Sequence, residues 1–368
     1  MITQHKRLKH PPFIDLTYPT KDTLKVAVGD RVTCGEWISD LRYAPLSGKV
    51  IEINQQMRFI RIENDRQDTL SDDFLSLSTK ERVRRYFSPT EPYERFSVES
   101  SIPITLFTYL SNEPFISLDD QSMHEIKLAL KRLIQTILNV FKVPYVTLVV
   151  RAQDRLSYEA YLGHKGIRYH NVDVSKETDH LYASINTLHD QALKRNKPYQ
   201  ALGLHSLFQL NQLLIEETPP KEGWFVCAGE GFKEATQVFA RLFTPMSFIH
   251  AVLELKDEET TMFEGLILRE QAMRAWPISI HHTTTSWYGK TPLKTDVMPC
   301  IECGRCVKHC PVNLFPQKIH KALTLGQNVG RLSPTACIGC GLCSFYCPSR
   351  IPLRESAVEA AAWGRRYG

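Results

Sequence analysis

Long hydrophobic runs are absent from this sequence of 368 residues. No stretch reaches the eighteen or so uninterrupted apolar residues of a membrane-spanning helix. The opening residues, Met1-Ile2-Thr3-Gln4-His5-Lys6, also lack the apolar core of a secretory signal peptide. We therefore expect a cytoplasmic protein with no transmembrane segment of its own. Any attachment to the inner face of the cell membrane is then expected to come through partner subunits.

Features of nucleic-acid and dinucleotide binding are also missing. No basic stripe is interleaved with aromatic residues, which argues against a nucleic-acid interface. Gly229-Glu230-Gly231 has no third glycine at the offset of a dinucleotide-binding loop, so a turn is favoured there. The net charge of +5 excludes little, and a hydrophobic fraction of 43% permits a sizeable core. The length suggests two to four domains.

Cysteine is the informative residue, because eight of the ten cysteines fall in two copies of one spacing. The copies are Cys300-x2-Cys303-x2-Cys306-x3-Cys310-Pro311 and Cys337-x2-Cys340-x2-Cys343-x3-Cys347-Pro348. This is the bacterial-ferredoxin pattern for two [4Fe-4S] clusters. Zinc sites favour separated Cys pairs, and disulfides need an oxidising compartment. The spacing therefore predicts an electron carrier.

In this pattern the fourth cysteine of each run usually ligates the cluster of the other run. We therefore expect cluster 1 to be held by Cys300, Cys303, Cys306 and Cys347. Cluster 2 is expected to be held by Cys337, Cys340, Cys343 and Cys310. The 26 residues between Cys310 and Cys337 include an amphipathic helix predicted at 315–325.

The charge of the C-terminal part fits this prediction. From residue 281 onward there are eleven Lys and Arg but four Asp and Glu, an excess that two anionic clusters would partly offset. A basic docking face for an acidic partner or for lipid headgroups is the alternative, and both can hold. His281 and His282 lie in an irregular polar segment and are interpreted as exposed residues rather than metal ligands.

The N-terminal part shows a β pattern between residues 24 and 64, with alternating apolar residues broken by Gly29-Asp30 and Ser47-Gly48. This pattern resembles the hammerhead, or barrel-sandwich, domain of biotinyl and lipoyl carriers. Residues 38–43 stand where carriers present their modified lysine, and they contain none. We therefore interpret the domain as structural, and Cys34 in it as an inert small residue.

The middle of the chain alternates strands and helices. Strands are predicted at 102–109 and 145–150, and helices at 121–141 and 177–195, which indicates a parallel sheet covered by helices. A helix at 204–215 and a strand at 224–229 follow. We expect four domains: a barrel-sandwich hybrid at 1–80, a degenerate Rossmann-like α/β domain at 81–200, a small SLBB-like segment at 201–285 and a dicluster ferredoxin domain at 286–368.

This order of parts resembles RnfC, the peripheral subunit of Rnf electron-transport complexes. The match is closest in Cys300-Ile301-Glu302-Cys303-Gly304-Arg305-Cys306, in Leu314-Phe315-Pro316-Gln317 and in residues 337–353. Asn112-Glu113-Pro114-Phe115, with Asp120 after it, is similar to the flavin-side loop of that family. The resemblance implies membrane-embedded and soluble redox partners, and Asn112, Glu113 and Asp120 as candidate flavin-side residues.

The chain departs from RnfC just before that loop. RnfC proteins have a glycine-rich loop there, whereas residues 88–97 contain no glycine. Backbone amides need such glycines to approach a phosphate closely, so this absence argues against bound FMN and NADH. In this respect the middle resembles NqrA of sodium-translocating NADH:quinone reductases, with Arg84-Arg85-Tyr86-Phe87 in place of a related motif. NqrA has no dicluster module.

These features favour an iron–sulfur electron-transfer subunit of an Rnf/Nqr-like redox complex. Two alternatives stay open at this point. One is a flavin- and NADH-dependent oxidoreductase with its own FMN beside Glu113 and Asp120. The other is a non-catalytic scaffold with structural clusters.

Overall fold

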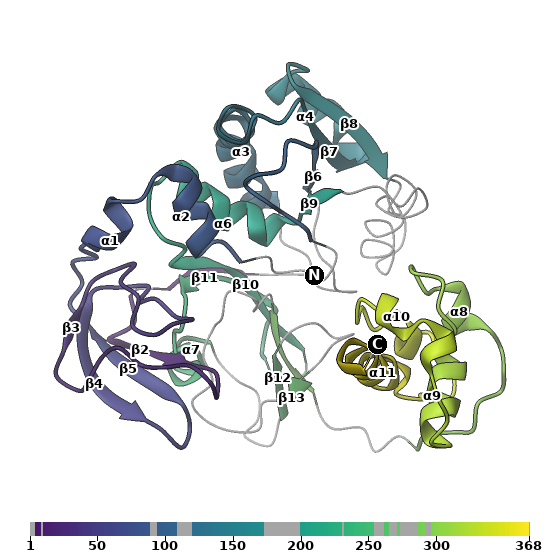
Figure 1. The fold of residues 1–368 in the computed structure, drawn as a ribbon. Helices are drawn as coiled ribbons and strands as arrows, with labels where there is room; N and C mark the ends of the chain where they lie inside the picture. The colour runs from purple at the N-terminus through teal and green to yellow at the C-terminus, as the bar shows by residue number, and fades with distance from the viewer. Residues whose placement is uncertain are drawn as a thin grey trace.

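The computed structural model describes residues 4–8, 10–88, 94–108, 120–172, 199–229, 232–253, 261–264, 271–272, 286–290 and 296–367. Figure 1 shows a mixed α/β protein built from three sheets and a C-terminal group of short helices. Among the described residues, no helix is both long and apolar enough to cross a lipid bilayer. The predicted helix at 177–195, and the residues His281 and His282, lie outside the described part.

The N-terminal sheet has four strands in the order β2-β5-β4-β3. They are β2 (Phe13–Thr17), β3 (Arg31–Val32), β4 (Gly48–Asn54) and β5 (Phe59–Asn64), followed by the helices α1 (Asp72–Leu75) and α2 (Thr79–Tyr86). Alternate residues of β4 point inward, as the sequence pattern indicates. The first part of that pattern forms no long strand, because Leu24 makes only an isolated bridge to Ser39.

The six-stranded sheet has the order β1-β11-β10-β14-β12-β13. Its first strand comes from the beginning of the described chain and pairs in parallel with β11. The elements are β1 (Gln4–Arg7), β10 (Glu222–Gly229), β11 (Thr236–Arg241), β12 (Thr261–Glu264), β13 (Gln271–Ala272) and β14 (Ser286–Lys290), with α7 (Met246–Val252) after β11. One core joins this sheet to the N-terminal sheet, and the buried Arg241 guanidinium donates to Asp68 Oδ2 at 2.7 Å beside it.

The central sheet is entirely parallel, in the order β8-β7-β6-β9. It contains β6 (Ile104–Phe107), β7 (Val146–Arg151), β8 (Ile167–Val172) and β9 (Gln200–Leu202). The chain first runs outward from β6 to β8 and then returns to place β9 on the other side of β6. This reversal is the switch point at which doubly wound sheets bind ligands, outside the carboxyl ends of the strands.

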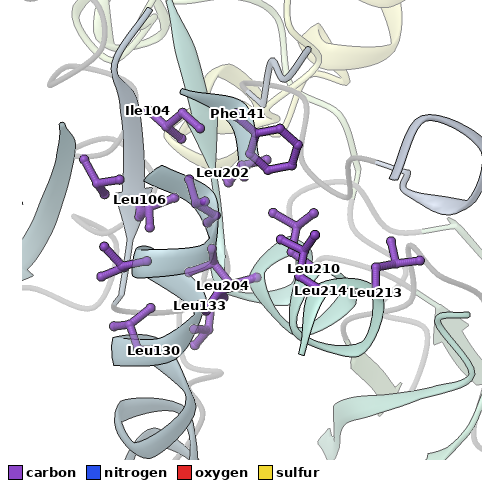
Figure 2. Packing of buried hydrophobic residues seen from close by; sticks show 14 of the residues in the cluster. Ile104, Leu106, Leu130, Leu133, Phe141, Leu202, Leu204, Leu210, Leu213 and Leu214 are labelled. Atoms are coloured by element: carbon purple, nitrogen blue, oxygen red, sulfur yellow. The ribbon is translucent and has the colours of Figure 1, made fainter. Parts of the chain in front are cut away.

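The helices of this part are α3 (Asp120–Phe141), η1 (Ala152–Asp154), α4 (Arg155–Leu162) and α6 (Leu204–Leu214). Figure 2 shows side chains of β6 and β9 packed against leucines of α3 and α6. Because neighbouring strand residues point to opposite faces, Leu106 and Leu202 belong to this core. Phe107 and Ala201 face a different hydrophobic cluster on the opposite side of the sheet.

The C-terminal helices gather in one small unit in Figure 1. They are α8 (Arg305–Lys308), α9 (Pro316–Thr324), η4 (Gly330–Leu332), η5 (Pro334–Ala336), α10 (Leu342–Phe345) and α11 (Leu353–Tyr367). Pro316 occupies the first turn of α9, where its missing N–H costs nothing. Ile319 and Ala322 of α9 pack with Ala360 of α11. The predicted helix at 315–325 is therefore present and is anchored by the C-terminal helix.

Candidate iron–sulfur centre

The two cysteine runs have the same backbone shape. Gly304 and Gly341 cap α8 and α10 in the left-handed conformation, with φ of 70° and 84°. The residue two places before each is also left-handed, with φ of 55° at Glu302 and 68° at Gly339. Glycine adopts this left-handed conformation without strain, so it suits the positions at which the backbone turns around the thiols. The two runs therefore repeat the same local backbone conformation.

Four thiols from both runs surround one cavity. Its lining includes Cys300, Cys303 and Cys306 of the first run and Cys347 of the second. Ile351 and Leu353 close it from the start of α11. Gly304 also lines it, and a methyl group added there would meet no heavy atom within 4 Å. The structure thus brings together the residues that the sequence predicts for cluster 1.

The other four cysteines also lie close to one another. Burial raises the pKa of the Cys343 thiol, and the neighbouring Cys340, Cys337 and Cys310 raise it further. The pKa of Cys310 is raised by burial and by Cys337, while backbone N–H groups of the following turn oppose the rise. One of these groups, the N–H of Leu314, donates to Cys310 Sγ at 3.2 Å. The predicted set for cluster 2 is therefore also assembled.

The electrostatics of the buried thiols fit a cationic iron centre. Burial raises the pKa of Cys306 above its ordinary value, and Cys347 and Cys300 contribute in the same direction. Several thiolates cannot lie together in a buried space unless positive charge compensates them. Bound iron would supply that charge and would keep its thiol ligands deprotonated.

A [4Fe-4S] cluster needs a wider spacing of its thiols than a single metal ion does. In the described part of the chain, no group of three or more His, Cys, Asp or Glu side chains is placed to hold one ion. Four thiolates around one zinc ion would lie about 3.8 Å from each other, since each Zn–S bond is about 2.3 Å. In a cubane each thiolate binds a different iron at a different corner, so the sulfurs are more widely spaced.

The second run is packed against the central sheet. One hydrophobic cluster joins Cys340 and Leu342 to four strand residues, Phe107, Val149, Val172 and Ala201. Ile338 and Tyr346 are partly buried against the same cluster. Cys340 of the second set therefore lies between its own helices and the sheet face opposite α3 and α6.

Within the described ranges, no sheet covers the first run in this way. All ten residues from 296 to 305 are exposed, including Cys300 and Cys303. Their placement is still defined by hydrogen bonds, because the N–H of Met298 donates to the Ser349 carbonyl at 3.0 Å and the Ser349 hydroxyl donates to the Pro299 carbonyl at 2.9 Å. The two runs share a local fold but differ in exposure.

The predicted flavin-side residues are only partly reached by the structure. Asn112 and Glu113 lie outside the described residues. Asp120 is the first residue of α3, and its side chain is not among those described. The structure does describe the switch point of the central sheet, where α6 begins directly after β9.

The N-terminus of α6 is capped by a carboxylate of the chain itself, that of Glu94. The backbone N–H of Gly203 and the hydroxyl of Ser206 donate to the two carboxylate oxygens of Glu94, the latter at 2.7 Å. Glu94 is 2% exposed and belongs to the glycine-free segment at 88–97. Helix N-termini at switch points are common phosphate sites. At this position a cofactor phosphate does not fit, because a carboxylate takes its place.

The sequence did not reveal two residues that shape these sites, Glu94 and Gln317. Glu94 has no local pattern that reveals its contact with a helix more than a hundred residues later. Gln317 follows a helix-initiating proline, and its amide oxygen accepts from Cys306 Sγ at 3.3 Å. Its place in Leu314-Phe315-Pro316-Gln317 was the available clue. Cys34 and Cys227 are buried elsewhere, and burial raises the pKa of both thiols, which fits an inert role.

Comparisons with known proteins agree with this geometry at the C-terminus. Residues 299–351 match the family described as the 4Fe-4S dicluster domain. No curated protein matches the chain. Two similar solved structures are NAD+-reducing [NiFe]-hydrogenase in the H2-reduced state and in the air-oxidized state.

The H2-reduced structure shares 9% identity over 73% of this chain and 56% of its own, with a TM-score of 0.42. The air-oxidized structure shares 10% identity over 78% and 57%, with a TM-score of 0.45. This chain thus spans little more than half of either, and scores this low carry no inference about function. The family match and the two assembled cysteine sets together make this a mixed α/β iron–sulfur protein with a C-terminal 4Fe-4S dicluster domain.

Proposed function

We propose that this chain is the iron–sulfur electron-transfer subunit of an Rnf/Nqr-like, membrane-associated redox complex. In this role it relays single electrons between a soluble partner and membrane-embedded subunits, and it lies at the cytoplasmic face of the membrane. The observation that carries the proposal is the cavity lined by Cys300, Cys303, Cys306 and Cys347 within the matched dicluster segment.

The proposed ligand sets are the two crossed sets, with Cys347 serving the first run and Cys310 the second. When bound, each [4Fe-4S] cluster accepts and releases one electron. The chain holds the thiols in place, excludes water with Ile351 and Leu353, and directs polar groups at the sulfurs. Backbone N–H groups of Leu314 and Gly339 donate to Cys310 and Cys337 at 3.2 and 3.4 Å. Such donors favour the more negative, reduced state.

Anaerobic reconstitution of the full chain tests the cluster assignment. We expect about eight irons and eight sulfides per chain, and electron paramagnetic resonance signals from two reducible clusters. A chain that retains few irons, or clusters that no reductant reduces, contradicts the proposal. The second result would instead favour a scaffold with structural clusters.

Membership of a complex needs a separate experiment. A tagged chain isolated from its native cells under mild detergent should bring membrane-embedded redox subunits with it. Recovery of the chain alone, with clusters intact, contradicts the complex and leaves the electron-transfer role standing. An FMN- and NADH-dependent enzyme is disfavoured by Glu94 at the switch point. Flavin absorbance in the purified chain would revive it.

A further inference from the structure

Three exposed large apolar side chains of the dicluster domain lie at the first cysteine run or just before it, whereas Leu325, Phe345 and Trp363 are exposed elsewhere in the domain. Val297, Met298 and Ile301 have exposed fractions of 57%, 59% and 67%, and Phe315 after the run is 44% exposed. Ile301 lines the same cavity as the four thiols of the first set. Large apolar residues gathered on a surface mark sites of protein contact more often than scattered ones do.

The repeated fold shows how a run of this shape makes such a contact. Ile301 and Arg305 occupy the positions that Ile338 and Leu342 occupy in the second run. In the second run these positions pack against the central sheet, and Leu342 is fully buried. In the first run the equivalent surface faces solvent. The chain thus uses one copy of this surface internally and leaves the other open.

The charges around the open copy indicate what binds there. Four exposed cations flank the first run: Arg305, Lys308, Lys318 and Arg350. The exposed carboxylates within residues 296–305 are Asp296 and Glu302, so these six charged residues carry a net charge of +2. Within the described residues, no ion pair joins any of these four cations to a carboxylate. A positive rim around an apolar centre complements an acidic protein surface.

We propose that this first-run surface, formed by Val297, Met298, Ile301, Arg305, Lys308 and Phe315, docks an acidic one-electron carrier protein. The inference rests on the proposed function, because it assigns the first cysteine set to exchange with the outside and the second to exchange within the assembly. In each transfer the carrier loses or gains one electron and the dicluster domain gains or loses the same electron. No covalent bond forms or breaks.

The test uses the full chain with both clusters and a plant-type [2Fe-2S] ferredoxin, an acidic carrier, as the probe. Wild-type protein should bind the probe at low salt and lose affinity as salt rises. We expect Ile301→Ser and Lys308→Glu each to weaken binding about tenfold, and Arg305→Glu to slow association by a similar factor. Arg331→Glu, an equal charge change on η4, is the matched control and should leave binding unchanged.

Iron content and resonance spectra of each variant are recorded first, so that loss of a cluster is not mistaken for loss of docking. Absence of clusters from wild-type protein overturns the proposed function. Intact clusters with no salt-dependent binding of the probe overturn the docking surface alone. So does an equal loss in the Arg331→Glu control. Vesicles of anionic phospholipid are the last arm, and rim variants that weaken only vesicle binding show a membrane surface instead.

Discussion

The rings of His309 and Tyr346 stack 3.6 Å apart, centroid to centroid, with their planes 11° from parallel. Each residue directly precedes the fourth cysteine of its run, so the stack joins equivalent positions of the two repeats. We expect His309→Ala to weaken the unit by about 1 kcal/mol, which is about fivefold in rate. The bleaching of cluster absorbance in denaturant measures it. His309→Phe should retain most of the stability, and a bleaching rate as fast as that of His309→Ala would contradict the stacking explanation.

Crossed ligation predicts which cluster each variant loses. Cys347→Ala should lower iron from about eight to about four atoms per chain, by removing the cluster held with Cys300, Cys303 and Cys306. Because Cys303→Ala removes the same cluster, the double variant should also keep about four. If ligation is not crossed, the double variant loses both clusters. Cys227→Ala, in a buried β10 position far from either set in sequence, should keep all eight.

Gln317 should set the potential of the first cluster. In the thiol form Cys306 donates to its amide oxygen at 3.3 Å, and against a thiolate the amide can turn its NH2 group to the sulfur instead. Gln317→Leu removes that donor, so the reduced state loses stabilisation and the potential should become more negative. A redox titration followed by electron paramagnetic resonance measures the shift. Gln327→Leu, an exposed glutamine on the same insert, should cause none, and a positive shift in Gln317→Leu would refute the role.

Glu94 should be important for the central domain. Glu94→Ala leaves the Gly203 N–H and the Ser206 hydroxyl without their acceptor at the start of α6. We expect a loss of about 2 kcal/mol in the free energy of unfolding. Glu99→Ala removes an exposed carboxylate paired with Arg84 and should cost less than about 1 kcal/mol. Equal losses in the two variants would show that the cap contributes nothing special.

The buried thiol of Cys34 should make the free energy of unfolding depend on pH. Burial raises the pKa of its thiol from 9.0 to about 12. The folded state therefore favours the protonated thiol, and this stabilisation is complete below about pH 9 and is lost as the pH rises toward 12. Folded protein should resist iodoacetamide at Cys34 at pH 8, and denatured protein should react there at pH 9. Mass spectrometry of the Cys34 peptide reads this out, and rapid alkylation of the folded chain at pH 8 would disprove it.

Local features of the fold were predictable from the sequence. The spacing of apolar residues predicts a helix at 121–141, and α3 spans Asp120–Phe141. The structure also assembles both predicted cysteine sets, because the spacing within each run is dictated by the geometry of one cluster. Ligation itself remains a prediction.

Contacts between distant segments were not predictable. The pairing of Gln4 with Thr236 in β1 and β11 depends on tertiary packing, and no periodicity encodes it. The burial of Glu94 on α6 and of Leu342 on the central sheet has the same origin. The different exposure of the two cysteine runs follows from that packing, so it is visible only in the structure.

The apolar contact between Leu342 and Phe107 limits how the dicluster domain can be moved into another protein. In an isolated C-terminal fragment, Ile338, Cys340 and Leu342 would be exposed to water. A cluster bound by the second cysteine set would then be open to oxygen and chelators. A protein engineered to carry this domain will need an apolar surface to cover the second run, whereas the exposed first run will need none.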